Sequence, residues 1–159
     1  MTQSSVAVGT TFPGEVLETH TGGRVDLTSL GGPAVVYFYP ADNTPGCTKE
    51  ALAFDRAYDE FTAAGVTVVG VSVDDTDSHK CFADDHELHF PLVADTGGEL
   101  TRRLGLLKDY GQYGELAARV TFLLDQAGVI RRIWEVTDPA AHPEEVLAAA
   151  RALAQGDGA

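Results

Sequence analysis

The segment that decides the fold reads Ala34-Val35-Val36-Tyr37-Phe38-Tyr39-Pro40-Ala41-Asp42-Asn43-Thr44-Pro45-Gly46-Cys47-Thr48. Its first six residues form a continuous apolar run, which is typical of a strand buried on both faces of a sheet. Pro40 ends this strand because proline has no backbone N–H to donate. A helix is predicted from about residue 45 to residue 64, since apolar side chains recur there at helical spacing and Gly65 follows. Cys47 is therefore expected in the first turn of a helix that follows a buried strand.

Further strands and helices alternate on both sides of this segment. Residues 16–19 and 24–27 predict an N-terminal β-hairpin around Gly22 and Gly23. The later elements are a buried strand at 66–73, a helix that is capped by Asp77 or Ser78 and runs to about Glu87, a short strand at 92–94, a short helix at about 98–104, strands at 119–125 and 129–136, and a helix from His142 to about Ala154. This order predicts an α/β chain with a central mixed β-sheet flanked by helices on both faces. Among small α/β folds, the thioredoxin-like fold fits this order best.

The composition indicates an acidic protein with enough apolar residues for one core. The chain has 159 residues, 44% of them hydrophobic, which predicts a single domain over residues 1–159 with loose termini. The net charge of −13 repels phosphate backbones, so no nucleic-acid partner is expected. No apolar run reaches the roughly 18 residues of a membrane span, and no membrane partner is expected. The start of the chain lacks the features of a secretory signal, which favours a cytoplasmic location.

The chain contains only two cysteines, Cys47 and Cys81, which is too few for a dense disulfide framework. They could be inert core residues, metal ligands or a redox pair. The nearest candidates for a metal site with Cys81 are His86 and His89, but their positions on a helix form no compact triad and the common ligand spacings are absent. No metal is therefore expected. Two other histidines, His79 and His142, are expected at the surface.

Local sequence marks Cys47 as a reactive thiol. A free cysteine has a pKa of about 8.5 and is mostly protonated at neutral pH, so a catalytic thiol needs a neighbourhood that favours the thiolate. The first turn of a helix supplies unpaired N–H groups and the positive end of the helix dipole. Gly46 allows close approach of the backbone to a ligand, and an arginine close to the sulfur would add a permanent positive charge.

Two other residues of the segment have alternative interpretations. Thr44 lies three residues before Cys47, so its hydroxyl could orient a peroxide O–O bond at the mouth of the helix, or it could simply cap the helix. Pro40 could shield the sulfur from water, or it could only terminate the strand. The joint occurrence of Pro40, Thr44 and Cys47 within eight residues is more specific than any one of them.

Residues 36–50, which contain Thr44-Pro45-Gly46-Cys47-Thr48, resemble the active-site signature of the peroxiredoxins, and in particular of their Q-type branch, the bacterioferritin comigratory proteins. The similarity extends over nearly the whole chain. It includes the segments Gly9 to Pro13, Val71-Ser72-Val73-Asp74, Phe90 to Asp95 and Arg119 to Asp125. The resemblance implies a thioredoxin-like fold and a thiol-dependent peroxidase that needs no cofactor.

The resemblance also implies a role for each residue that matches the motif. Cys47 matches the peroxidatic cysteine, and Thr44 and Pro40 match the residues that position the peroxide and shield the thiolate. Arg119 matches the distant arginine that pairs with the thiolate and with the peroxide oxygens. Glu50 lies where the family often has a side chain that orients this arginine, although an acidic residue on a helix face is usually just solvated.

The second cysteine is assigned by the same comparison. Many Q-type members carry a partner cysteine five positions after the first, but that position is Leu52 here. Cys81 lies 81 − 47 = 34 positions downstream and matches a subgroup whose resolving cysteine sits on the helix after the second buried strand. The resemblance implies an intramolecular Cys47–Cys81 disulfide, whereas a passive helical cysteine is the alternative. Because the two cysteines would lie on different helices, we expect at least one helix to unwind partly during turnover.

The functional prediction is a peroxidase that reduces hydrogen peroxide and organic hydroperoxides and is recycled by thioredoxin, with glutaredoxin as an alternative donor. A thiol–disulfide oxidoreductase normally has a Cys-x-x-Cys pair, which this chain lacks. A redox sensor or chaperone-like protein that uses the same disulfide stays open as a second role. The Q-type resemblance leans towards a monomer, and an internal disulfide needs no second subunit.

Overall fold

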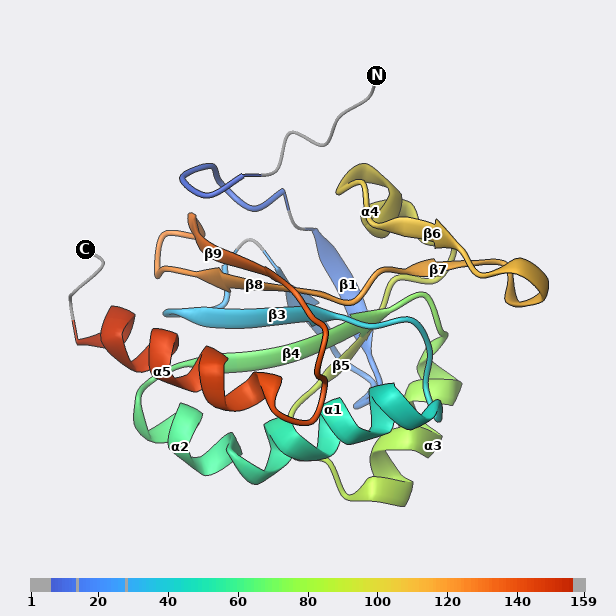
Figure 1. Ribbon diagram of the computed structural model, residues 1–159, viewed down its shortest axis with the longest axis horizontal. Coiled ribbons are helices and arrows are strands. Elements are labelled where there is room, and N and C mark those ends of the chain that lie inside the picture. Colours follow the sequence, from blue (N-terminus) through green and yellow to red (C-terminus); the bar gives the residue numbers. More distant parts are fainter. Residues whose placement is uncertain (1–6, 14, 28, 156–159) are drawn as a thin grey trace.

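The computed structural model describes residues 7–13, 15–27 and 29–155. The expectation of loose termini concerns mainly residues outside these ranges. The backbone forms a central β-sheet with its helices packed against both faces (Figure 1). This arrangement confirms the predicted fold class.

The central sheet has seven strands in the order β2-β1-β5-β4-β3-β8-β9. Their bounds are β1 Val16–Thr19, β2 Arg24–Asp26, β3 Ala34–Phe38, β4 Thr67–Ser72, β5 Leu92–Ala94, β8 Val120–Leu124 and β9 Ile130–Glu135. Strands β3, β4 and β5 pair in parallel, and every other pairing in this sheet is antiparallel. The adjacent strands β4, β3 and β8 are almost wholly buried, as expected for apolar runs covered on both faces. The predicted N-terminal hairpin is present as β1 and β2.

The helices are α1 Pro45–Arg56, α2 Tyr58–Ala63, α3 Thr76–His86, α4 Glu99–Arg103 and α5 His142–Ala154. The single helix predicted over residues 45–64 is wrong, because the chain bends at Ala57. Phe54 and Phe61 would lie about 10 Å apart along a straight helix, yet the centroids of their rings are 6.0 Å apart. The bend therefore keeps both rings in one buried cluster.

Helix α3 begins slightly earlier than predicted. Its N-cap is Asp75, whose carboxylate accepts a hydrogen bond from the backbone N–H of Ser78 at 2.9 Å. The prediction of Asp77 or Ser78 as the cap was wrong, because the chain adopts helical dihedrals from Thr76 onwards. Asp75 satisfies one of the N–H groups that a helix start leaves unpaired.

Each face of the central sheet carries its own apolar core. On one face, α1, α2, α3 and α5 cover the sheet, and the core beneath them contains Tyr37 of β3, Phe54 of α1 and Phe82 of α3. On the other face, α4 and the segment around Phe12 cover Phe38 and Phe122. Cys47 belongs to the first of these cores.

A second, small sheet was not predicted. Strands β6, Leu107–Asp109, and β7, Glu115–Ala117, form an antiparallel pair joined by a short 3-10 helix, η1, at Gly111–Tyr113. Figure 1 shows this hairpin projecting from the body of the protein just before the chain enters β8. No helix among the described residues has the length and apolar character needed to cross a membrane.

Candidate active site

Cys47 sits in the first turn of α1, directly after the loop that leaves β3. Its side chain is almost fully buried, with 1% exposure. The loop, residues 40–44, turns the chain from the carboxyl end of β3 into the helix, and Asn43 adopts a left-handed conformation with φ 66°. Ligands commonly bind at this edge of an α/β sheet, outside the carboxyl ends of its parallel strands.

Arg119 reaches Cys47 from a distant part of the chain. Its Nη2 donates a hydrogen bond to the Sγ of Cys47 at 3.4 Å. The register of the sheet explains this contact: β8 pairs antiparallel with β3, with Val120 opposite Phe38. Arg119 therefore lies level with the end of β3, where the loop to Cys47 begins. A guanidinium beside sulfur favours the anionic thiolate, which is the nucleophilic form.

Glu50 holds the other side of the same guanidinium. It lies three residues after Cys47, so both side chains lie on one face of α1. Its Oε1 accepts a hydrogen bond from Nη1 of Arg119 at 2.8 Å, and its Oε2 has no partner among the described residues. The carboxyl group is fully buried. The alternative of a solvated glutamate is therefore wrong.

Burial and the neighbouring charges shift the pKa values of Glu50 and Arg119. Burial raises the pKa of Glu50 from 4.5 to about 7, although the guanidinium of Arg119 acts to lower it. Burial also acts to lower the pKa of Arg119, but Cys47 and Glu50 outweigh it and hold this pKa above its ordinary value. Arg119 is thus a fixed positive charge, whereas Glu50 can gain or lose a proton near neutral pH.

Thr44 is the N-cap residue of α1 by its backbone conformation, but its side chain makes no capping hydrogen bond. Its hydroxyl instead donates to the carbonyl oxygen of Ala41 at 3.1 Å. This hydrogen bond fixes the hydroxyl oxygen within the loop and leaves its lone pairs available to a bound molecule. Pro40 is buried at the end of β3. The structure thus gathers Thr44, Cys47 and Arg119 at one site, with Pro40 at the end of the strand that leads into it.

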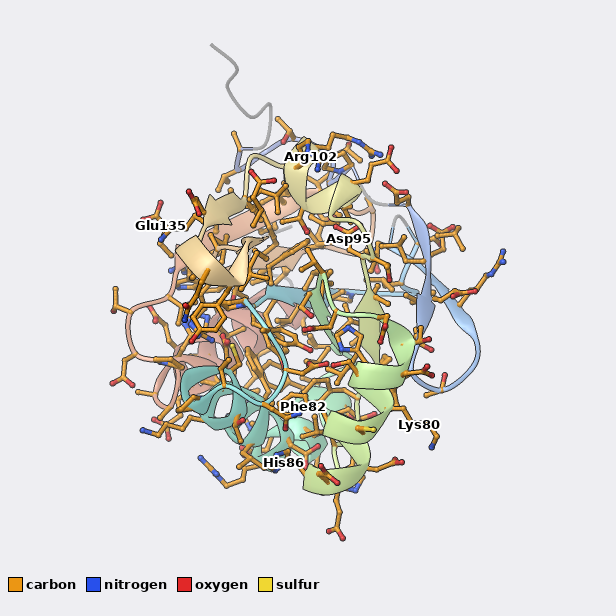
Figure 2. The ribbon with its side chains drawn as sticks, turned by 90° about the vertical axis from the view of Figure 1, so that its right-hand side faces the viewer. Lys80, Phe82, His86, Asp95, Arg102 and Glu135 are labelled. Atoms are coloured by element: carbon orange, nitrogen blue, oxygen red, sulfur yellow. The ribbon has the colours of Figure 1, made fainter. Side chains whose placement is uncertain are left out.

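Cys81 lies on α3, on the outside of the protein. Both cysteines are free thiols, and Cys81 is exposed whereas Cys47 is buried. Figure 2 shows the neighbours of Cys81 on α3: Lys80 points outward and Phe82 points into the protein. The structure therefore does not bring the two cysteines together in a bond.

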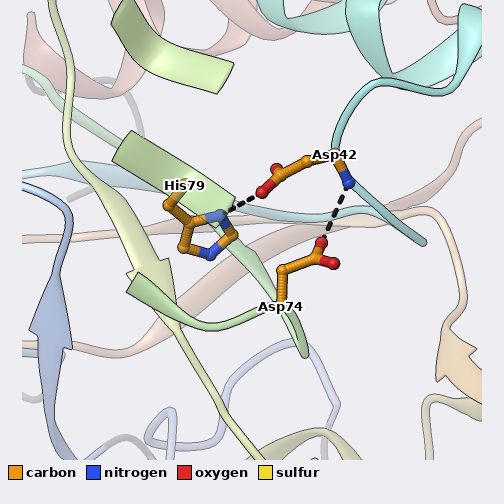
Figure 3. A group of neighbouring side chains, drawn as sticks. All are labelled: Asp42, Asp74 and His79. Atoms are coloured by element: carbon orange, nitrogen blue, oxygen red, sulfur yellow. Dashed lines mark hydrogen bonds and ion pairs between the residues drawn. The ribbon is translucent and has the colours of Figure 1, made fainter. Parts of the chain in front are cut away.

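Sequence reasoning missed a buried polar cluster between the loop and α3. Figure 3 shows His79 next to Asp42, with Nδ1 and Oδ2 2.8 Å apart, and Asp74 next to the backbone of Asp42. The surface placement of His79 and His142 was wrong, because both are buried. His142 is held by the hydroxyl of Thr121, 2.9 Å from its Nε2. No spacing in the sequence reveals either contact.

Asp42, Asp74 and His79 also have the chemistry of metal ligands, since their ligand atoms all lie within 4.8 Å of one another. These atoms already make hydrogen bonds, however. Oδ2 of Asp74 accepts from the hydroxyl of Ser72 at 2.6 Å and from the backbone N–H of Asp42 at 2.9 Å. A cation would have to displace these donors, so we interpret the cluster as a hydrogen-bond network.

A buried cysteine at the start of a helix, paired with an arginine at the end of the neighbouring strand of a thioredoxin-like sheet, defines a thiol peroxidase. Comparisons with known proteins lead to the same class. The model of the AhpC/TSA family matches residues 8–133. The chain is 41% identical to peroxiredoxin Q, chloroplastic, of Sedum lineare over 146 residues, which cover 91% of this chain and 77% of that protein.

Two solved structures have the same fold. The PrxQ mutant structure from Xylella fastidiosa has a TM-score of 0.86 and 32% identity, covering 96% of this chain and 99% of that one. The bacterioferritin comigratory protein of Xanthomonas campestris has a TM-score of 0.82 and 35% identity, with the same coverage. The chain belongs to the AhpC/TSA family, and its similarity to the Q-type peroxiredoxins confirms the resemblance read from the sequence.

Proposed function

We propose that Cys47 reduces hydrogen peroxide and organic hydroperoxides, that Cys81 then forms a disulfide with it, and that thioredoxin restores both thiols. The observation that carries the proposal is the guanidinium of Arg119, which bonds to the sulfur of Cys47 on one side and to the buried Glu50 on the other. This arrangement places a fixed positive charge beside the sulfur that has to act as an anion.

The first step exchanges one bond for another. The sulfur of Cys47 attacks the terminal oxygen of the hydroperoxide, an S–O bond forms and the O–O bond breaks. Cys47 becomes a sulfenic acid, and the other oxygen leaves as water or an alcohol after it takes up the proton released by the thiol. Sulfur is oxidised and the peroxide is reduced by the same two electrons.

The neighbours of Cys47 have separate tasks in this step. Arg119 stabilises the thiolate and the negative charge that develops on the peroxide oxygens. The hydroxyl of Thr44, fixed by its bond to Ala41, accepts a hydrogen bond from the hydroperoxide and aligns the O–O bond with the sulfur. Pro40, buried at the start of the loop, excludes water from the thiolate. Glu50 keeps the guanidinium in place.

The second step is the attack of the Cys81 thiol on the sulfenic acid. It forms the Cys47–Cys81 disulfide and releases water, and an external dithiol later reduces this disulfide to two thiols. A disulfide requires Cα atoms within about 7 Å. Since Cys47 is buried in the first turn of α1 and Cys81 is exposed on α3, at least one of these helices has to rearrange. The unpaired sulfenic acid would otherwise proceed to the irreversible sulfinic state.

Organic hydroperoxides are included because the solved structure of the Xanthomonas campestris relative is described by its alkyl peroxide reduction activity. Thioredoxin is proposed as the electron donor and glutaredoxin as the alternative. The monomeric state and the cytoplasmic location read from the sequence stay predictions.

The test is steady-state consumption of hydrogen peroxide and of cumene hydroperoxide by the wild type, Cys47→Ser and Cys81→Ser. Each is assayed with thioredoxin and its reductase, or with glutaredoxin and glutathione. We expect Cys47→Ser to abolish consumption. We expect Cys81→Ser to reduce one equivalent of peroxide rapidly and then stop. Normal turnover of Cys81→Ser would exclude Cys81 as the resolving residue, and a single turnover by the wild type with every donor would favour a redox sensor.

A further inference from the structure

The loop that carries the peroxide site is tied to α3 by a buried contact between Asp42 and His79. The side chains are 2% and 0% exposed, and Nδ1 of His79 lies 2.8 Å from Oδ2 of Asp42 (Figure 3). The other ring nitrogen, Nε2, lies 3.0 Å from the carbonyl oxygen of Val93 in β5. His79 therefore joins three separate parts of the chain.

Asp42 makes hydrogen bonds through both of its carboxylate oxygens and through its backbone N–H. Its Oδ1 accepts from the hydroxyl of Tyr39 at 2.6 Å, and its Oδ2 accepts from the hydroxyl of Ser78 at 2.8 Å. Its backbone N–H donates to Asp74 at 2.9 Å. Asp42 lies midway between Pro40 and Thr44, so these bonds fix the loop that presents the peroxide-binding hydroxyl.

The hydrogen bonding of the ring determines how strong the contact is. The carbonyl of Val93 can only accept, so Nε2 carries a hydrogen. Nδ1 then faces Oδ2 of Asp42 at 2.8 Å, and the same carboxyl group also accepts from the hydroxyl groups of Tyr39 and Ser78. Hydrogen bonds to a charged partner in a buried site are the strong ones. Separating His79 from Asp42 leaves buried polar groups without partners.

His79 is placed where this separation matters for turnover. It lies on α3 two residues before Cys81, and Ser78, on the same helix, also bonds to Asp42. A rearrangement of α3 that carries Cys81 to Cys47 has to pull this part of the helix away from the loop. The same contact therefore stabilises the peroxide site while it opposes formation of the disulfide.

We propose that His79 is a positioning residue whose bond to Asp42 holds α3 against the peroxide-site loop, and that its release limits the rate of Cys47–Cys81 disulfide formation. The inference rests on the proposed resolving role of Cys81. In this proposal the Asp42–His79 pair determines how much of the sulfenic acid becomes sulfinic acid and how much becomes the disulfide. A closed pair gives a second peroxide time to form sulfinic acid, and an open pair allows the disulfide.

The test measures the two steps separately in a single turnover. Reduced protein is mixed with one equivalent of hydrogen peroxide and quenched at millisecond intervals with an alkylating reagent or with dimedone. Mass spectrometry then gives the amounts of thiol, sulfenic acid and disulfide. The variants are His79→Gln and Ser78→Ala. The controls are Lys80→Ala, an exposed change on the same helix, and His142→Gln, which loses a buried imidazole bond elsewhere.

We expect His79→Gln to form the disulfide about tenfold faster than the wild type, as the loss of one strong buried hydrogen bond predicts. Formation of the sulfenic acid should change less than formation of the disulfide. Ser78→Ala should shift the same step in the same direction by a smaller factor. Both controls should stay within about twofold of the wild type, and excess peroxide should produce less sulfinic acid in His79→Gln than in the wild type.

Three results would overturn the proposal. The first is a disulfide step in His79→Gln that is no faster than in the wild type, and the second is an equal slowing of both steps, which indicates a merely structural residue. The third is a wild type that forms no Cys47–Cys81 disulfide, in which case the proposed resolving role has failed as well. If circular dichroism shows that His79→Gln does not fold, Ser78→Ala decides the question alone.

Discussion

Gly46 lies against Arg119 so closely that a Cβ atom at Gly46 would sit 3.0 Å from Nη2 of the guanidinium. This is the nitrogen that donates to the sulfur of Cys47. The same Cβ would lie 3.7 Å from the ring of Pro139. The absence of a side chain at Gly46 is therefore part of what lets Arg119 reach Cys47.

Gly46→Ala is expected to slow the reaction of Cys47 with peroxide about tenfold without destabilising the protein. The guanidinium has to move by a few tenths of an ångström, which lengthens its hydrogen bond to the sulfur. Alanine is a better helix former than glycine, so α1 itself gains stability. Stopped-flow mixing with peroxide and urea unfolding measure the two effects. Gly23→Ala, whose Cβ would meet only Thr21 at 3.8 Å, is the control. A normal rate in Gly46→Ala would contradict the argument.

Glu50→Gln is expected to change how stability depends on pH. The folded-state pKa of Glu50 is about 7, above its value of 4.5 in the unfolded chain, because burial disfavours the carboxylate. The folded protein therefore binds more protons than the unfolded chain between these values, and stability decreases as pH rises through this window. Below pH 4.5 Glu50 is protonated in both the folded and the unfolded state, and its full contribution to the free energy of unfolding is present.

The measurement is the free energy of unfolding of the wild type minus that of Glu50→Gln. This difference should fall by about 2 kcal/mol between pH 5.5 and pH 8. The side-chain amide that Glu50→Gln introduces keeps an oxygen acceptor for Arg119, so the geometry of the site is retained. All unfolding measurements are made at a pH above the isoelectric point of about 4.5, where the chain carries net negative charge. A difference that is flat with pH would show that Glu50 does not titrate in this range.

Two buried tyrosines give a matched test of hydrogen bonding in the core. Tyr37 and Tyr39 are both at most 1% exposed, but the hydroxyl of Tyr37 has no partner among the described residues, whereas that of Tyr39 donates to Asp42. Tyr37→Phe should leave the free energy of unfolding unchanged or raise it by up to about 1 kcal/mol, because an unsatisfied group is removed. Tyr39→Phe should lower it by about 1 to 3 kcal/mol. Equal effects in urea unfolding would contradict this assignment.

The sequence predicts the parts of the fold that depend on local pattern. The buried strands β3, β4 and β8 follow from continuous apolar runs, and the end of α5 from its helical periodicity. The bend at Ala57 could not be predicted, because no glycine or proline marks it; the rings of Phe54 and Phe61 pack together on either side of it. The β6–β7 hairpin was missed because its three-residue strands are largely exposed and carry no apolar run, unlike the equally short but buried β5.

The same distinction holds for the site. Cys47 is recognisable from its own segment, and Glu50 shares its face of α1 by spacing. Arg119 lies 72 residues away, and only the resemblance indicated it, since its position depends on the register between β3 and β8. His79 was misplaced because the pattern of α3 does not show that the loop with Asp42 covers it. Contacts between distant segments are beyond what spacing along one chain can show.

Thr44→Val separates the two interpretations of Thr44, cap and peroxide ligand. A residue at the N-cap normally contributes about 1 kcal/mol through its side-chain oxygen, but Thr44 makes no such bond, and its hydroxyl donates to Ala41 instead. We therefore expect Thr44→Val, which keeps the branched shape, to cost less in the free energy of unfolding than Asp75→Ala, which removes a cap that is made in α3. The predicted difference is about 0.5 kcal/mol or more.

The effect of Thr44→Val on catalysis should be much larger than its effect on stability. Without the hydroxyl, the peroxide loses the hydrogen bond that aligns its O–O bond with the sulfur of Cys47, and the first step should slow by about 10- to 100-fold. Thr44→Ser keeps the hydroxyl and should recover most of this rate. Stopped-flow measurement of sulfenic acid formation gives the rates of all three proteins. If Thr44→Ser is as slow as Thr44→Val, the methyl group is what matters, and if neither is slow while both are destabilised, Thr44 acts as a structural residue of the loop.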